Sequence, residues 1–295
     1  MNFDLLSELT SRRSLLRKAS LYAVALAAGR AFAEPSAKAF TFLAINDLHY
    51  LDADCGRWFR AMIAQMKASA PEAKVCLLSG DLTDLGEQEA AASVKEIFGT
   101  LGVPFHMVPG NHDYEPKKQS RAGYDAVFPG KLNYRFEQDG WQFIALDTTM
   151  GTKADKTTIA ESTLAWLDAE LPQLDPQKPT VVFTHFPLGE GVAMRPLNAE
   201  ALLERLVKLN LAAVFSGHWH GASERKVAHA TLTTSRCSAR VRNNMDKYPH
   251  KGWFVCEAKA DGTVTRRFVD FDAPADIPTP DAAAKKPAAY EAPAK

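Results

Sequence analysis

The sequence predicts an α/β fold in which helices cover mixed β-sheets. Short apolar runs typical of buried strands alternate with segments whose apolar residues recur at helical spacing. The last third of the chain instead alternates in the manner of strands, with turn signals between them. The 295 residues are 46% hydrophobic and 24% charged, close to the average for globular proteins. This composition excludes collagen-like, coiled-coil and wholly disordered chains.

The first elements alternate between strand and helix. Residues 40–45 are a short apolar run and predict a buried strand. Apolar side chains then recur every three or four residues over 56–69, which predicts an amphipathic helix; they are Trp58, Phe59, Met62, Ile63 and Met66. The alternation repeats with a strand at 75–78, a helix at 86–99 and a strand at 105–108.

A hairpin signal separates this part from the rest. Asp139-Gly140 lies between the apolar runs 132–136 and 141–146, and such a dipeptide favours a tight turn between antiparallel strands. The elements predicted after it are a helix around Leu164, Leu167 and Leu171, a strand at 181–183, a helix around Leu202, Leu203, Leu206 and Val207, a strand at 212–215, and strands within 224–271 with a turn at Asp261-Gly262. Such an order builds a largely buried mixed sheet system with helices outside.

The N-terminus has the features of an export signal. Arg12-Arg13 precedes a mild, alanine-rich apolar stretch at 19–29, and Ala31-Phe32-Ala33 provides a small-residue cleavage site. We therefore expect 1–33 to be a signal peptide of the twin-arginine type, recognised by export machinery, and the protein to be periplasmic or secreted. An amphipathic N-terminal helix is the alternative, but it does not explain the A-x-A sequence.

The remaining chain divides simply. Residues 273–295 consist largely of Ala, Pro, Asp and Lys, and we expect them to be disordered. Residues 38–272 then form one domain, and no apolar run is long enough for a transmembrane span. The formal net charge is zero, and residues 1–33 carry five basic and two acidic residues, which leaves −3 for the rest. This balance argues against nucleic acid as a partner.

The four cysteines show no metal-binding spacing. Cys76 and Cys256 lie in apolar runs, which predicts buried free thiols. Two disulfides involving these residues, Cys55 and Cys237 are the alternative for an exported protein.

Polar side chains follow five of the predicted strands at their carboxyl ends, where α/β sheets place ligand sites. They are Asp47 and His49, Asp81, Asn111, His185, and His218 and His220. Carboxylate, amide and imidazole donors suit Mn, Fe, Zn or Co. Seven donors are too many for one ion, and they suit two divalent ions that share a carboxylate.

The motifs D-x-H, GD-x-x-D, GNHD, a lone His after a strand, and GH-x-H follow one another from Asp47 to His220. In this order they resemble the calcineurin-like metallophosphoesterase family. The resemblance implies a four-layer α/β/β/α sandwich of two mixed β-sheets flanked by helices. It also implies a dinuclear-metal-dependent hydrolase in which a metal-bridging hydroxide attacks a small soluble phosphodiester or phosphomonoester.

The resemblance also assigns roles to residues. It implies Asp47, His49 and His220 as ligands of one metal, Asn111, His185 and His218 as ligands of the other, and Asp81 as the bridge. His112 resembles the histidine that protonates the leaving oxygen, and Asp113 would orient and charge-stabilise it.

Several alternatives stay open at this point. A cyclic-nucleotide phosphodiesterase is the main functional alternative, while a nuclease or a non-catalytic metal-binding scaffold fits less well. Asp84 is expected to cap the next helix or to orient a ligand rather than to bind metal. His106 is expected to be a core histidine with its hydrogen bonds satisfied, and Arg236 and Arg240 to be solvated rather than to contact phosphate. The loops that would recognise the substrate carry no motif.

Overall fold

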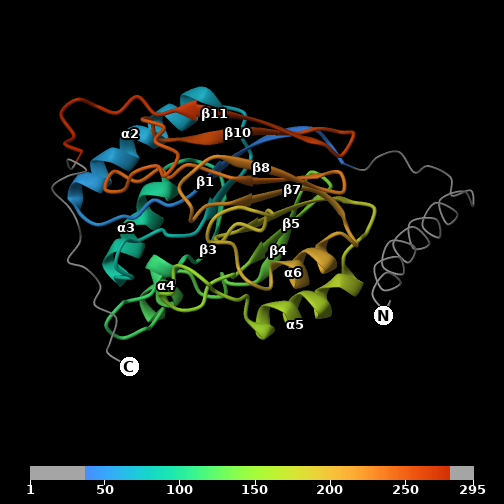
Figure 1. Ribbon diagram of the computed structural model, residues 1–295. Helices are drawn as coiled ribbons and strands as arrows, with labels where there is room; N and C mark the ends of the chain where they lie inside the picture. The colour runs from blue at the N-terminus through green and yellow to red at the C-terminus, as the bar shows by residue number, and fades with distance from the viewer. Residues whose placement is uncertain (1–36, 280–295) are drawn as a thin grey trace, which may run out of the picture. The chain divides into compact units, whose positions relative to one another are not determined.

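The computed structural model describes residues 37–279 (Figure 1). The expected signal peptide and the last sixteen residues of the expected tail lie outside this range. Within it, no helix combines the length and the apolar character needed to cross a membrane.

Two mixed sheets form the centre of the domain. The first sheet has the order β11-β10-β1-β2-β3, with strands β1 (Phe40–Ile45), β2 (Cys76–Ser79), β3 (Phe105–Val108), β10 (Gly252–Ala258) and β11 (Val264–Asp270). The second has the order β4-β5-β6-β7-β9-β8, with strands β4 (Tyr134–Gln138), β5 (Trp141–Leu146), β6 (Pro179–Thr184), β7 (Asn210–Ser216), β8 (Ser223–Val227) and β9 (Ala230–Thr234).

The pairing directions bring the predicted site together. Strands β1, β2 and β3 are mutually parallel, and so are β5, β6, β7 and β9. The antiparallel pairs lie at the sheet edges, where β10 and β11 join β1, β4 joins β5, and β8 joins β9. The carboxyl ends of the parallel strands within each sheet therefore point to one edge.

Helices cover the outer faces of both sheets (Figure 1). They are α2 (Ala53–Ser69), α3 (Gln88–Gly99), α4 (Ala122–Val127), α5 (Glu161–Glu170) and α6 (Ala199–Leu206), with short 3₁₀ turns η1 (Asn111–Asp113) and η2 (Leu171–Gln173). One apolar core lies between α2, α3 and the first sheet, and another between α5, α6 and the second.

A third core joins the two sheets. It contains aromatic side chains from both, among them Phe42, Phe143, Phe183 and Phe215. Phe42 packs edge-on against Phe143 and Phe215, with ring centroids 5.8 and 5.7 Å apart. The three cores separate four layers, which confirms the predicted α/β/β/α sandwich.

Most predicted elements are confirmed, including the hairpin at Asp139-Gly140, where Gln138 pairs with Trp141. Helix α2 begins earlier than predicted because Asp52 caps it, accepting a hydrogen bond from the Cys55 amide at 3.0 Å. All four cysteines are buried and free, which confirms the prediction for Cys76 and Cys256.

The end of the chain and one core histidine differ from the predictions. Residues 273–279 of the expected disordered tail are ordered, because Ile277 packs into the core beneath α2 with only 7% of its surface exposed. His106 stacks on Phe136, with ring centroids 3.6 Å apart. Its buried Nδ1 has no hydrogen-bond partner among the described residues, so it is a packed but unsatisfied histidine.

Candidate metal centre

The loops after β1, β2, β3, β6 and β7 bring the seven predicted donors into one buried cluster. Two groups of potential ligand atoms there consist of the predicted donors alone, the first from Asp47, His49, Asp81 and His220 and the second from Asp81, His185 and His218; a third combines His49 with Asp84 and His112. Asn111 adjoins the second group, since its Oδ1 lies 3.2 Å from His185 Nε2. Asp81 belongs to both groups, as a bridging carboxylate must.

The backbone is strained where these side chains begin. Five of the seven donor residues have a left-handed φ between 47° and 68°: Asp47, His49, Asp81, His218 and His220. Non-glycine residues adopt this region at a cost, and such strain concentrates at functional sites. Gly110 relieves crowding nearby, because a Cβ there would lie 2.1 Å from Asp81 Oδ1.

The first group surrounds a point suited to a cation. His49 Nε2 lies 3.1 Å from His220 Nε2 and 3.5 Å from Asp81 Oδ2. His220 Nε2 lies 3.3 Å from Asp47 Oδ1. Metal–ligand bonds of about 2.0–2.2 Å separate neighbouring ligand atoms by about 3.0–3.5 Å. The observed spacings match these values.

The second group has the same spacing. His185 Nε2 lies 3.4 Å from Asp81 Oδ1 and 3.1 Å from His218 Nδ1. The two carboxylate oxygens of Asp81 thus turn toward different groups. The His112 amide donates to Oδ1 at 2.8 Å, which fixes the rotation of this carboxylate.

Each histidine of the cluster is oriented through its other nitrogen. His185 Nδ1 donates to the Ser79 carbonyl at 3.0 Å, and His218 Nε2 donates to the Ala154 carbonyl at 2.7 Å. His220 Nδ1 faces the Asn243 carbonyl at 3.3 Å. Carbonyls only accept, so the opposite nitrogen keeps its lone pair for the cluster. This outer hydrogen bonding is typical of metal-ligating histidines.

Burial and neighbouring charges shift the pKa values of the Asp and His side chains in the cluster. Burial would raise the pKa of Asp47, but His220 and His185 lower it to about 2. Burial would lower the pKa of His185, but Asp81 and Asp47 raise it to about 9. Burial and the charge of Asp81 raise the pKa of Asp113 to about 6. Burial lowers the pKa of His49 to about 4 and that of His218 to about 3, so these two histidines are neutral at pH 7 and can offer a lone pair to a cation.

His112 lies at the edge of the cluster, with 31% of its side chain exposed. Its Nδ1 donates to the Asp84 carbonyl at 2.9 Å, which leaves Nε2 available on the cleft side. The ring packs edge-on against His49, with centroids 4.7 Å apart. A proton donor beside the cluster is what ester cleavage requires.

Asp113 does not contact the His112 side chain, which it was expected to orient. Its carboxylate accepts hydrogen bonds from the amides of Leu82, Thr83 and Gly110 at 3.1, 2.9 and 2.8 Å. Among the described residues, nothing joins it to the His112 ring. Asp113 ties the β3 loop to the β2 loop, and so it acts on the site through the backbone.

Asp84 orients a ligand, one of the two roles expected for it, and does not cap α3. Its Oδ1 lies 3.0 Å from His49 Nδ1. The same oxygen accepts from Nε and Nη2 of Arg242, at 2.9 and 2.5 Å. Sequence reasoning missed Arg242, which lies in an irregular segment after β9. The parallel pairing of β9 with β7 places that segment at the same sheet edge as the donors, a relation that the sequence alone does not reveal.

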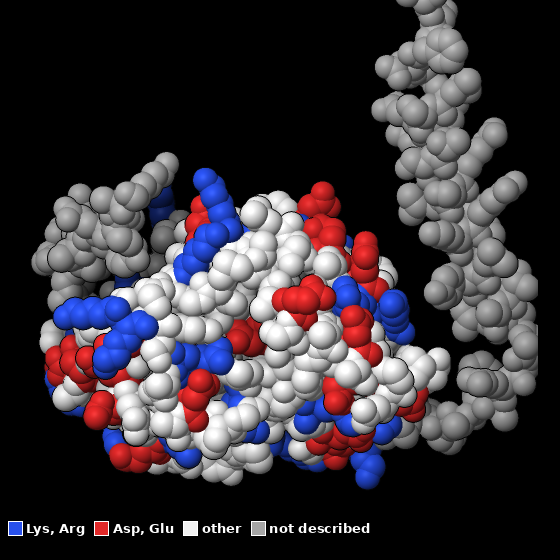
Figure 2. All heavy atoms as spheres, turned by 90° about the horizontal axis from the view of Figure 1, so that it is seen from below, with Lys and Arg blue, Asp and Glu red and all other residues white. Residues whose placement is uncertain are grey.

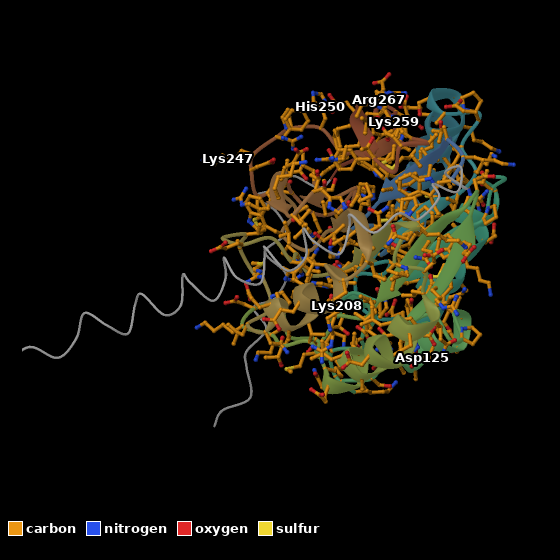
Figure 3. The ribbon with its side chains drawn as sticks, turned by 90° about the vertical axis from the view of Figure 1, so that its right-hand side faces the viewer. Asp125, Lys208, Lys247, His250, Lys259 and Arg267 are labelled. Carbon is orange, nitrogen blue, oxygen red and sulfur yellow. The ribbon has the colours of Figure 1, made fainter. Side chains whose placement is uncertain are left out.

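The other two arginines lie apart from the cluster. Arg240 is buried, not solvated as expected, and binds both oxygens of Asp52. Arg236 is half-buried, pairs with Asp246 and stacks on the Tyr248 ring at 3.8 Å. His229 and His250 are both exposed, and His250 lies at the periphery (Figure 3).

A cleft of about 670 Å³ opens over the cluster. His49, Asp81, Asn111, His112, His218 and His220 form its polar floor, together with Asp84, Arg242 and Asn243. Its walls are apolar and include Leu51, Leu85, Met194, Val241 and Met245. A polar floor beneath apolar walls suits a ligand with one charged group and one organic group.

The nitrogen and oxygen donors fit a pair of divalent ions. They include two carboxylates, one amide and four imidazoles held at coordination distance, a set suited to Mn, Fe or Zn.

Comparisons with known proteins agree with this geometry. A family model described as calcineurin-like phosphoesterase matches residues 40–222. A glycerophosphodiester phosphodiesterase of Enterobacter lignolyticus is 27% identical over 63% of this chain and 69% of its own. A 3′,5′-cyclic-nucleotide phosphodiesterase of Nostoc is 28% identical over 62% of this chain and 72% of its own.

Solved structures share the fold. A dimetal phosphatase from Danio rerio aligns with a TM-score of 0.58 and 17% identity, over 79% of this chain and 99% of its own. A purple acid phosphatase from yellow lupin also gives 0.58, with 13% identity, over 82% of this chain and 53% of its own. These alignments support the four-layer architecture.

Asp81→Asn should weaken the binding of both ions. The loss should exceed the roughly 10–100-fold fall in metal affinity that follows when a residue that only hydrogen-bonds a metal ligand is replaced. An amide lacks the charge that holds two cations together. Elemental analysis after dialysis measures the effect, with the exposed Asp125→Asn (Figure 3) as the control. Retention of two ions by Asp81→Asn would contradict the bridging role.

Metal binding should release protons and tighten as pH rises. The pKa of His185 is raised to about 9, so this histidine is protonated at pH 7 without metal and must lose its proton to coordinate. The pKa of His220 is also raised, so affinity should rise with pH up to at least about 9. Calorimetry in two buffers of different ionisation enthalpy measures the released protons. Equal heats in both buffers, with constant affinity from about pH 6 to 9, would be the contrary result.

Proposed function

Because this chain belongs to the calcineurin-like phosphoesterase family, we propose that it hydrolyses a small phosphodiester at the cluster around Asp81. It is a metallophosphoesterase with a buried Asp/His cluster. The observation that carries the proposal is the sharing of Asp81 between two donor groups, with His112 lining the cleft over the cluster.

The protein's own residues supply positioning and a proton. Two bound divalent ions would provide an activated water and neutralise charge on the phosphoryl group. His112 lines the cleft and its Nδ1 is held by the Asp84 carbonyl, so Nε2 is the nitrogen left for the substrate. In its doubly protonated form His112 can donate from Nε2 to the leaving oxygen, and the carbonyl stabilises the positive ring.

The cleft walls indicate what the organic group of the ester is like. Leu85 and Met245 are 41% and 60% exposed beside the cluster, and exposed apolar side chains at a cleft mark contact surface for a ligand. Methionine also adapts its shape to flat or irregular groups. These walls favour a diester with a bulky, partly apolar alcohol. A cyclic nucleotide fits this description better than a glycerophosphodiester does.

Nucleic acid fits this surface poorly. On the face shown in Figure 2, Lys and Arg side chains are interspersed with Asp and Glu. Long nucleic acids are bound mainly through continuous basic surfaces. A small substrate that enters the cleft is the better match.

A substrate comparison with the metal-loaded protein tests the proposal. Bis(p-nitrophenyl) phosphate should be hydrolysed faster than p-nitrophenyl phosphate, and 3′,5′-cyclic AMP faster than a glycerophosphodiester, whose polar alcohol gains less from apolar walls. Asp81→Asn protein is the control for contaminating activity. Turnover of the monoester alone, or no turnover with two ions bound, would refute the proposal.

His112→Ala should lower turnover of an alkyl diester by about 10²–10⁴-fold while leaving metal content nearly unchanged. The contact of His112 with Asp81 is through its backbone amide, which alanine keeps. The loss should be much smaller for bis(p-nitrophenyl) phosphate, because nitrophenolate leaves without a proton. Exposed His250→Ala serves as the matched control, and an equal loss on both substrates would exclude His112 as the acid.

A further inference from the structure

Arg242 occupies a position in the cleft that its ion pair alone does not explain. It lines the same cleft as His49, Asp81 and His112. Its side chain is 26% exposed, so the guanidinium is half-buried and still reaches the open space. Among the described residues that line this cleft, it is the one Lys or Arg.

The contacts of Arg242 leave much of its hydrogen-bonding capacity unused. A guanidinium has five N–H donors. Nε and Nη2 each donate to a single oxygen, Asp84 Oδ1. Within the described chain, Nη1 has no hydrogen-bond acceptor.

Asp84 hydrogen-bonds both Arg242 and His112. The Asp84 side chain holds Arg242 and His49, while its carbonyl oxygen holds His112 Nδ1. The guanidinium, the proton donor and a metal-ligand histidine are therefore fixed relative to one another before substrate enters. Prior fixing of this kind lowers the entropy lost when a ligand binds.

We propose that Arg242 is a substrate-binding residue whose Nη1 donates to a non-bridging oxygen of the phosphoryl group. This inference rests on the proposed phosphoesterase function and adds a residue to the substrate site. Asp84 acts as a positioning residue, since it holds the guanidinium at the cleft. Arginine suits this role because it stays charged and offers a rigid fork of donors to phosphate.

Inorganic phosphate is the probe, measured by calorimetry on metal-loaded protein and as a competitive inhibitor of bis(p-nitrophenyl) phosphate hydrolysis. Arg242→Ala should keep two ions per chain and raise both the phosphate Kd and the KM by about 10–100-fold, the loss expected for a hydrogen bond to a charged group. Arg242→Lys should recover part of the phosphate affinity through its charge.

Arg236→Ala is the matched control, because Arg236 is also half-buried and paired with an aspartate but lies outside the cleft. Its phosphate Kd should equal that of the wild type. An unchanged phosphate Kd in metal-loaded Arg242→Ala would overturn the inference. So would loss of metal from that variant with phosphate affinity restored by excess metal, since Arg242 would then act only through Asp84 and His49.

The phosphate arm also separates this inference from the proposed function. A wild-type protein that binds phosphate but hydrolyses no ester would refute the proposed function, while the phosphate Kd of the Arg242 variants would still decide the role of Arg242.

Discussion

The sharing of one buried carboxylate, Asp81, between two groups of donors is the constraint on which the rest of the site depends. A buried carboxylate is tolerated only with compensating charge and hydrogen bonds, and Asp81 obtains them from histidines on different strands. His49 approaches Oδ2 from the β1 loop, and His185 approaches Oδ1 from the β6 loop. Because β1 and β6 belong to different sheets, the site exists only while the two sheets keep their spacing.

The aromatic core between the sheets sets that spacing. Phe42 of β1 contacts Phe143 of β5 and Phe215 of β7 edge-on, and such packing resists sliding because ring edges and faces must stay matched. Facing sheets lie about 10 Å apart, too far for donors on the strands themselves to meet. The donors therefore sit in the loops beyond the strand ends, where the chain turns inward with left-handed residues and close glycine contacts.

The sequence predicted those parts of the site that are local, and it missed those that depend on distant contacts. Each donor follows directly on an apolar strand, so the strand pattern alone placed all seven. Arg242 lies in an irregular segment, and its position is fixed by Asp84, far away in the chain.

The contact predicted for Asp113 was wrong for a related reason. Neighbours in a 3₁₀ turn point about 120° apart, so adjacency to His112 in η1 separates their side chains. Ile277 was overlooked because one apolar residue in a Pro/Ala-rich stretch gives no periodicity.

The D-x-H and H-x-H motifs use the same backbone arrangement from opposite sheets. In each, both ligand residues are left-handed: Asp47 and His49 after β1, and His218 and His220 after β7. The alternation sends the middle residue to the other side of the loop. After β1 that residue is Leu48, which is fully buried in the core beneath α2. Burial of a leucine contributes about 1.5–3 kcal/mol, comparable to the roughly 1–2 kcal/mol that each left-handed residue costs. Burial of Leu48 thus offsets part of the strain that orients the two candidate ligands, which explains why a leucine stands between Asp47 and His49.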